Sequence, residues 1–321
     1  MSNESLTNSM GKITLFALPI AASSLVNILG NFISMLFLAR LGRLELAAAV
    51  LAFFSYITIS SVGFMTINAV SILVSHAKEG KLEKIPSIVI NGFCLAILLA
   101  VGIALILWHF DKLLLWLGQD PKLVAIAKGY FHYNALAMLP MMLVVTAAQF
   151  YIGIGKPQVS LVISVLRLPI IIVSAYAFVL GKWGLPQCGL TGVAIASFIT
   201  QIVTLVVLLV YFPVAGIVKK YQIFSRRAVV SLYEIKKILF LGLPIGAQFV
   251  GELAAVTVAS YFMGYLGINA LAASQIVTQF VTFIIMVFFG LTQALSVLVS
   301  RYYAQKNMLL IKQYVIAASF V

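Results

Sequence analysis

Charged residues are scarce in this sequence, at 9% of its 321 residues, and acidic residues are scarcer still, with eight Asp and Glu together. A soluble domain carries roughly 25% charged residues. Apolar residues make up 63% of the chain, and the mean hydropathy is +1.13. Because hydrocarbon penalises charge, this balance excludes an ordinary soluble enzyme or binding domain and indicates a polytopic membrane protein.

Cysteine and histidine are also rare. The two cysteines, Cys94 and Cys188, lie in or beside apolar runs, which indicates neither a disulfide framework nor a metal cluster. His76, His109 and His132 lie in or near loops or span ends and have no partner at metal-ligand spacing. We therefore expect no metal site and no cofactor.

The formal net charge is +13, a value also seen in nucleic-acid-binding proteins. The distribution of Lys and Arg favours a simpler interpretation, in which these residues set membrane topology and nucleic acid is not a partner. With the N-terminus in the cytoplasm, the inner segments hold 14 Lys and Arg and the outer segments hold 6. We therefore expect a multi-pass protein of the inner or plasma membrane with a cytoplasmic N-terminus. The inner residues are Lys12, Lys78, Lys81, Lys84, Lys156, Lys219, Lys220, Arg226, Arg227, Lys236, Lys237, Arg301, Lys306 and Lys312, and the outer ones are Arg40, Arg43, Lys112, Lys122, Lys128 and Lys182.

Long apolar runs recur along the chain, and a membrane-spanning helix needs about 20 mainly apolar residues. The stretch 110–125 is too polar to span and is expected to form an interfacial helix and turn. The fold class is therefore an all-α polytopic membrane protein. We expect a ninth span that begins near Tyr314 after eight complete spans, near 13–39, 46–74, 87–107, 129–153, 158–181, 189–215, 238–264 and 269–299.

The sequence contains an internal repeat. Residues 12–81 align without a gap onto residues 237–306 at a constant offset of 225, and 21 of these 70 positions are identical. A repeat of this length governs the whole fold. It predicts two six-helix units, twelve helices when complete, of which about eight and a half are present here, since Val321 maps onto Ala96 inside an apolar run.

Each predicted unit has six spans, an even number, so both units enter the membrane from the same side. Repeats of this kind are related by an axis along the membrane normal, with the substrate path between them. We expect an N-terminal lobe over 1–215, a cytoplasmic linker over 216–237 and a partial C-terminal lobe over 238–321.

One carboxylate lies inside a predicted span. The other seven acidic residues fall in termini, loops or the linker, whereas Glu252 lies near the middle of 238–264. An ionised carboxylate at that depth is costly, so Glu252 can be protonated in one state and charged in another, as a proton-coupled carrier requires. We interpret Glu252 as the proton and cation site. The alternative is a Glu that only holds neighbouring helices together through hydrogen bonds.

Other polar side chains within the spans are candidates for lining a substrate cavity. Gln248 precedes Glu252 by four residues and so shares its helix face, and the position equivalent to Glu252 in the first unit is Asn27. Amides of this kind can equally tie helices together. The candidates are Gln248, Gln275, Thr278, Gln279 and Thr282 in the second unit, and Asn27, Asn31 and Ser34 in the first.

Prolines and one arginine also interrupt the apolar spans. Pro19 and Pro244 occupy equivalent positions in the first helix of each unit. Proline removes a backbone hydrogen bond and kinks a helix, so both are hinge candidates for alternating access or else static bends. Arg167 lies beside Pro169 within a span, and we expect it to extend toward the cytoplasmic face, with a substrate role as the alternative.

Six segments taken together carry a family resemblance. In this order and combination, the chain resembles the multidrug and toxic compound extrusion (MATE) transporters over its whole length, as roughly the first seventy per cent of such a protein. The segments are LPIAAS at 18–23, LARLGRLELAA at 38–48, LGQDP at 117–121, GIGKP at 153–157, GKWGLP at 181–186 and GLTGVAIAS at 189–197.

The resemblance implies twelve helices in two lobes and export of cationic and amphipathic drugs, driven by inward flow of H⁺ or Na⁺. The family's seventh-helix Glu, eight residues after a Pro, matches Glu252 after Pro244. Many bacterial members carry an Asp on the first helix where this chain has Ser34, and paired Asn or Asp on the fifth helix where it has Ile171 and Ala175. This difference favours H⁺ over Na⁺ as the coupling ion. We expect drugs and membrane lipid as partners, and we expect the transporter to be a monomer.

Other function classes fit the sequence less well. A lipid-linked oligosaccharide flippase of a related fold would need several intramembrane Arg or Lys to hold a phosphate, and only Arg167 is available. An intramembrane enzyme would need paired acids, metal ligands or a nucleophile with a base. We therefore expect a transporter without catalytic residues, and a receptor is the remaining alternative.

Overall fold

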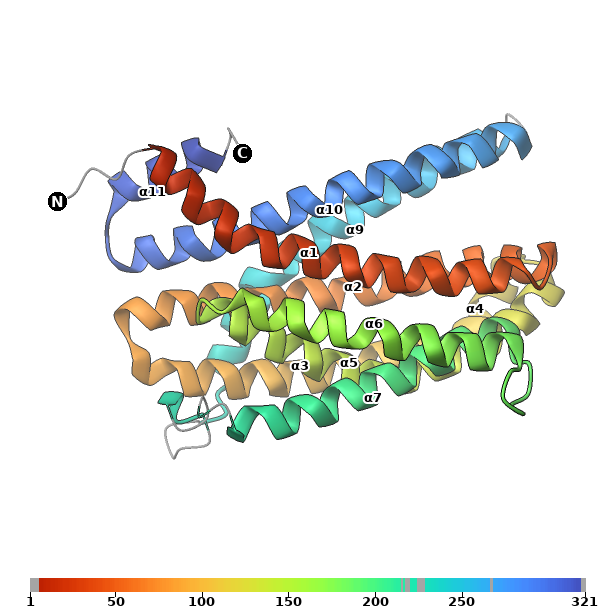
Figure 1. Ribbon diagram of the computed structural model, residues 1–321, viewed down its shortest axis with the longest axis horizontal. Helices are drawn as coiled ribbons and strands as arrows, with labels where there is room; N and C mark the ends of the chain where they lie inside the picture. The colour runs from red at the N-terminus through yellow and green to blue at the C-terminus, as the bar shows by residue number, and fades with distance from the viewer. Residues whose placement is uncertain (1–5, 215, 217–219, 224–228, 266–267, 319–321) are drawn as a thin grey trace.

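The computed structural model describes residues 6–214, 216, 220–223, 229–265 and 268–318. Every regular element within these ranges is a helix. Figure 1 shows the long helices running side by side along the longest axis of the molecule. Seven of the described helices are long and apolar enough to cross a membrane. The chain is therefore an all-helical membrane protein, as the composition predicts.

The first unit consists of six long helices joined by short connectors. Two of the connectors are helical, η1 (Leu82–Lys84) and α4 (Phe110–Trp116). Helix α4 occupies the first part of the stretch 110–125 that was predicted to form a helix and turn, whereas residues 121–125 belong to the next long helix. All six predicted spans of this unit are confirmed as helices. The long helices are α1 (Leu6–Ala39), α2 (Arg43–Gly80), α3 (Ile85–Trp108), α5 (Pro121–Gly153), α6 (Pro157–Leu180) and α7 (Gly189–Val214).

Helix α5 is longer than the apolar run that predicted it. Asp120 is its N-cap residue, and Asp120 Oδ1 accepts a hydrogen bond from the Lys122 backbone N at 2.8 Å. Pro121 follows at the first helical position, where its missing N–H would have no partner in any case. The helix therefore begins at 121, ahead of the predicted span at 129.

The second unit consists of α9 (Leu232–Tyr265), α10 (Ile268–Ala304) and α11 (Met308–Ala318). Shifted by the repeat offset of 225, the bounds of α9 and α10 fall within one residue of those of α1 and α2. Pro19 and Pro244 both lie inside their helices. The sequence repeat is thus also a structural repeat, whereas the division into two separate lobes stays a prediction.

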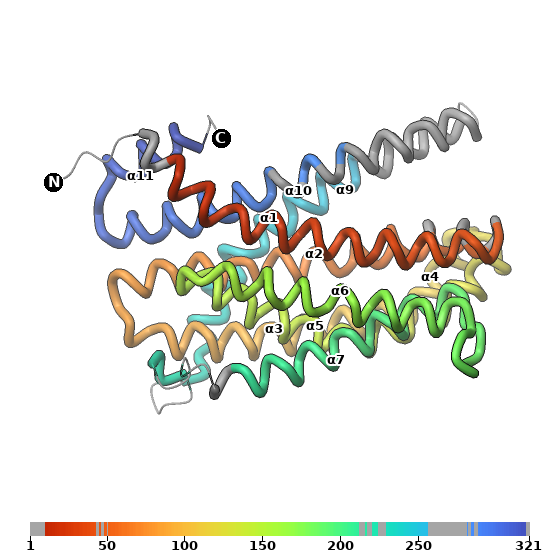
Figure 2. The backbone as a smooth tube through the Cα atoms, in the orientation of Figure 1, coloured from red at the N-terminus to blue at the C-terminus, as the bar shows by residue number. Residues whose placement is uncertain are grey.

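The two units pack against each other through their first two helices. Helix α2 lies against α9, and α1 lies against α10. In both contacts the first helix of one unit packs against the second helix of the other unit. Helices α2 and α10 also touch directly, and α11 lies beside the start of α1. Figure 2 shows α1 running between α10 and α6. This arrangement is the one expected for units related by a two-fold rotation.

Glycine permits the closest of these approaches. A Cβ atom at Gly242 of α9 would collide with the carbonyl oxygen of Thr66 on α2. At the corresponding contact between α1 and α10, a Cβ atom at Gly290 of α10 would lie 2.7 Å from the Cα atom of Ala21 on α1. Small residues allow helix backbones to approach in membranes, where packing rather than the hydrophobic effect holds helices together.

Candidate functional site

Three amide side chains form a hydrogen-bonded chain across the contact between the units. Gln149 Nε2 on α5 donates to Asn68 Oδ1 on α2 at 2.6 Å. Gln293 Nε2 on α10 donates to Gln149 Oε1 at 2.8 Å. Asn68 and Gln293 are repeat equivalents, 225 positions apart, so Gln149 joins two corresponding positions. We call these three residues the amide bridge. Sequence analysis missed it, although the offset pairing of Asn68 with Gln293 was a usable signal.

Ser75 and Ser300 form two reciprocal hydrogen bonds between α2 and α10. Ser75 Oγ donates to the Val297 carbonyl oxygen, and Ser300 Oγ donates to the Ile72 carbonyl oxygen, both at 2.8 Å. The offset of 225 converts each bond into the other, because it carries Ser75 to Ser300 and Ile72 to Val297. The two-fold axis that relates the units therefore passes between α2 and α10.

An ion pair joins the same two helices near their ends. Glu79 Oε1 on α2 lies 3.4 Å from Arg301 Nε on α10, and Gln305 Nε2 donates to Glu79 Oε2 at 2.9 Å. Lys78 Nζ donates to the Ile154 carbonyl oxygen at 2.7 Å. We call this end of the molecule the basic end, because Lys78, Lys156, Lys220 and Arg301 lie close to one another there. The two units are thus joined there.

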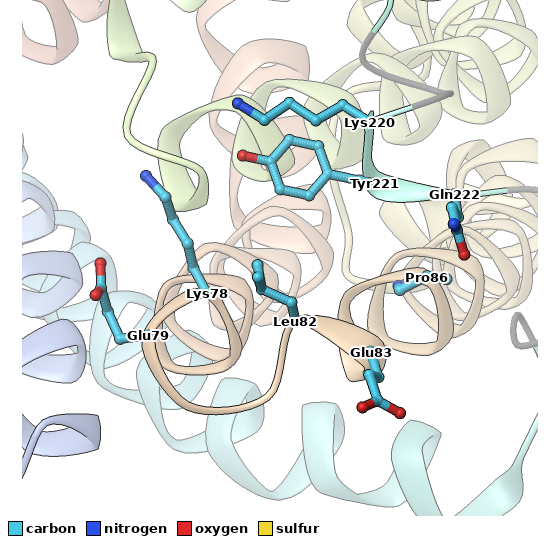
Figure 3. Close-up of a pocket in the computed structure, with 8 residues that line it drawn as sticks. All are labelled: Lys78, Glu79, Leu82, Glu83, Pro86, Lys220, Tyr221 and Gln222. Atoms are coloured by element: carbon cyan, nitrogen blue, oxygen red, sulfur yellow. The ribbon is translucent and has the colours of Figure 1, made fainter.

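A cavity of about 460 Å³ lies beside this ion pair. Figure 3 shows Lys78 pointing toward Tyr221 and Lys220, whereas Glu79 and Glu83 point away from them. Burial raises the pKa of the Tyr221 hydroxyl. The lining residues come from the end of α2, η1, the start of α3 and the segment 220–222, so the cavity belongs to the loop region and not to the helix interior.

A second cavity, of about 170 Å³, lies among α1, α2, α5, α6 and α10, and we call it the first-unit cavity. The Ser23 and Ser164 hydroxyls are 2.8 Å apart, and Asn27 Nδ2 donates to Ser164 Oγ at 3.1 Å. The amide bridge forms another part of the wall. Arg167 also lines the cavity, and its Nε atom is buried. The expectation that Arg167 extends to the cytoplasmic face is therefore wrong, because its face of α6 turns toward α1.

Of the three candidates in the first unit, only Asn27 lines this cavity. Ser34 is buried, but its hydroxyl donates to the Gly30 carbonyl oxygen of its own helix at 2.9 Å, and Asn31 is exposed. Helices α1 and α6 meet just beyond Asn27, where a Cβ atom at Gly30 would lie 3.0 Å from Ile171 Cγ2. Asn31 and Ser34 therefore do not line this cavity, and their proposed role as cavity residues stays a prediction.

Glu252 lies on α9 and has Gln248 as its hydrogen-bond partner. Gln248 Nε2 donates to Glu252 Oε1 at 3.1 Å, which confirms that the two share a helix face. The role of Glu252 as the proton and cation site stays a prediction, and both side chains are exposed in the described chain. The repeat supplies the reason. Gln248 and Glu252 correspond to Ser23 and Asn27, which face α6, and the described part of the second unit holds no equivalent of α6.

Four further candidates lie on α10, but their side chains are outside the described residues. They are Gln275, Thr278, Gln279 and Thr282, whose backbone is helical. Their proposed role stays a prediction. Among the residues whose side chains are described, no group of three or more His, Cys, Asp or Glu could hold a metal ion.

Replacing either serine of the reciprocal pair by alanine should cost the same free energy of unfolding, about 1 kcal/mol. The costs should match because Ser75 and Ser300 make equivalent bonds. Ser296→Ala is the control, since its hydroxyl bonds only to Thr292 within α10. Denaturant unfolding in detergent measures the three losses. Clearly unequal losses for Ser75→Ala and Ser300→Ala would contradict the two-fold relation.

Comparison with known proteins adds a family-level similarity. A family model described as MatE matches residues 19–177 and 244–321. The two matched segments begin at Pro19 and Pro244, which are equivalent positions of the repeat. The match therefore covers both units in the register that the repeat predicts.

Similar proteins carry the name "Probable multidrug resistance protein NorM". The one from Synechocystis sp. is 28% identical over 92% of this chain and 65% of its own length. The one from Pseudomonas putida is 30% identical over 94% of this chain and 66% of its own length. The chain spans about two thirds of the length of these relatives.

Solved structures share the fold. A multidrug resistance MATE family transporter of the MOP superfamily, described in an outward-facing conformation, superposes with a TM-score of 0.84 at 20% identity, over 97% of this chain and 68% of that one. A eukaryotic MATE transporter superposes with a TM-score of 0.84 at 19% identity, over 98% and 69%. The chain thus has the helix arrangement of these proteins over more than two thirds of their length.

Proposed function

The chain belongs to the MatE family, and on this basis we propose that the protein is a secondary active multidrug efflux antiporter. It exports small cationic or amphipathic organic compounds across the inner or plasma membrane in exchange for H⁺, with Na⁺ as the alternative ion. The observation that carries this proposal is the position of Glu252, the one acid within the spans predicted from the sequence, on the first helix of the second unit of the repeat. The names of the similar proteins support the same function.

In this proposal Glu252 binds the exported cation and the incoming proton in turn. When Glu252 is deprotonated, its negative charge attracts a cationic compound. The attraction is strong because the dielectric constant is low at this depth in the membrane. Gln248 stabilises this charged form through its hydrogen bond to Oε1. Protonation from outside removes the charge and releases the compound, and the neutral carboxyl group then returns at lower cost.

The proposed alternation involves two lobes, residues 1–215 and 238–321. The contacts of Ser75, Ser300 and the Glu79–Arg301 pair hold the lobes together at the basic end, which the distribution of Lys and Arg assigns to the cytoplasm. Opening toward the cytoplasm requires these bonds to break. Pro19 and Pro244 are the proposed hinges, at equivalent points of α1 and α9.

In this proposal the segment 229–231, which leads into α9, stays anchored to the first unit during the movement. Asn91 of α3 is buried, and its Nδ2 donates to the Val229 carbonyl oxygen at 2.9 Å. Asn91 Oδ1 accepts from the Ser231 backbone N at 2.8 Å. The start of α9 is thereby tied to α3, so the second lobe is proposed to turn about this end of α9.

Transport in vesicles tests the proposal. The full-length protein is reconstituted, a fluorescent cationic amphipath is supplied, and pH and Na⁺ gradients are imposed separately. We expect efflux with the pH gradient alone and none with the Na⁺ gradient alone. Efflux that follows only Na⁺ would overturn the proposed coupling ion, and efflux that follows neither gradient would overturn the antiporter.

A further inference from the structure

The first-unit cavity contains a positive charge with no matching negative charge. Arg167 lines the cavity, and its Nε atom is buried without a hydrogen-bond acceptor among the described residues. Tyr56 of α2 interacts with it electrostatically, but the Tyr56 hydroxyl bonds to Met141 Sδ at 3.3 Å. A buried N–H group of a charged side chain that lacks an acceptor is costly, particularly in the membrane interior.

No described carboxylate lines this cavity. Each of the described carboxylates lies elsewhere, on a helix end, in a loop or on α9, and most of them have partners of their own. Glu45 accepts from the Leu190 backbone N, Glu79 pairs with Arg301, Glu83 lines the cavity at the basic end, Asp111 pairs with Lys128, Asp120 caps α5, Glu234 lies in the first turn of α9 and Glu252 bonds to Gln248.

The rest of the cavity wall is polar but neutral. The hydroxyls of Ser23 and Ser164 lie 2.8 Å apart, and Asn27 directs its Nδ2 atom at Ser164 Oγ. These groups satisfy one another and leave the Arg167 Nε hydrogen without a partner. Arginine binds a carboxylate through two parallel N–H groups, and a free Nε allows such a bidentate contact from the side of the guanidinium group.

We propose that the first-unit cavity binds the carboxylate group of a small organic anion or zwitterion, with Arg167 as the residue that holds it. A volume of about 170 Å³ admits a carboxylate group with a small ring, and is below the roughly 300 Å³ at which pockets for whole drugs begin. The site goes beyond the proposed cation efflux, because it lies on α6 and carries the opposite charge to Glu252.

Binding of benzoate tests the site. The full-length protein in nanodiscs is titrated by calorimetry with benzoate, with uncharged benzamide and with cationic benzylamine, each in chloride-free buffer. We expect benzoate to bind about 10-fold or more tightly than either comparison compound, as one charge-assisted pair predicts. Equal binding of benzoate and benzamide would overturn the proposal without the need for any variant.

Variants then assign the binding to Arg167. Arg167→Gln should reduce benzoate affinity about 10-fold or more, whereas Arg167→Lys should retain part of it. Arg40→Gln is the matched control, since it removes a guanidinium group from the exposed end of α1. Unchanged affinity in a folded Arg167→Gln protein would overturn the proposal, as would an equal loss in Arg40→Gln.

Two further measurements distinguish this carboxylate site from an inorganic anion site and from the proposed cation site at Glu252. Chloride that displaces benzoate completely at low millimolar concentration would show an inorganic anion site and overturn the assignment to a carboxylate. Glu252→Gln should leave benzoate binding unchanged, so a failure of the proposed proton coupling is distinguishable from a failure of this site.

Discussion

Replacing Glu252 by glutamine should reduce pH-driven efflux to the rate of vesicles that contain no protein. Glutamine keeps the size and the hydrogen-bonding shape of the side chain, but it can neither carry the charge that attracts a cation nor accept the coupling proton. The side chain is exposed on α9 and hydrogen bonds only to Gln248 among the described residues. The substitution should therefore leave folding intact, and efflux of a fluorescent cation under a pH gradient measures its effect.

Glu83→Gln provides the matched control for this experiment. Glu83 is an exposed carboxylate in η1 at the basic end, far along the chain from α9. Its removal changes the net charge by the same amount and should leave efflux unchanged. If Glu252→Gln exported as fast as the unchanged protein, Glu252 would have no coupling role. The same conclusion would follow if both variants lost activity equally.

Replacing Gly242 by alanine should cost about 1–3 kcal/mol of stability, the range seen for overpacking. The added Cβ atom would collide with the Thr66 carbonyl oxygen, which belongs to the backbone of α2 and cannot rotate away. Helix α9 must shift away from α2 to admit it. Thermal unfolding in detergent should show a melting temperature lower by roughly 2–4 °C for each kcal/mol lost.

Gly251→Ala separates this packing effect from the general effect of adding a methyl group to a helix. Gly251 lies on the same helix, and its added Cβ atom would have no described atom within 4 Å. Alanine is the better helix former by about 1 kcal/mol, so Gly251→Ala should be neutral or stabilising. Equal melting temperatures for the two variants would contradict a close contact between α2 and α9.

The helices themselves were predictable from the chain alone. Each of the eight complete predicted spans is helical where the structure describes it, and α9 and α10 match α1 and α2 at the offset of 225. The ninth predicted span was expected to begin near Tyr314, but its helix begins at Met308. Boundaries were less exact, because N-terminal caps such as Asp120 extend a helix beyond its apolar run. The i, i+4 pairing of Gln248 with Glu252 was also correct, since it depends only on the geometry of one helix.

The direction in which side chains face was not predictable in the same way. Asn31 and Ser34 lie on the same helix as Asn27, yet only Asn27 lines the first-unit cavity. A membrane helix that is apolar on all sides gives no periodic signal for the face it turns inward. Arg167 was misplaced for the same reason, because its direction depends on how α6 packs on α1.

The amino-acid sequence determined by itself that this is a helical membrane protein built from a repeated unit, because apolar length and a fixed offset are properties of the linear chain. Only the tertiary structure decided which polar groups meet. Gln149 joins Asn68 to Gln293, and Arg167 stands in a cavity without a carboxylate, while Glu252 lies outside it. The physical reason is that these contacts depend on the rotation and crossing of helices far apart in the chain, which packing between whole helices sets.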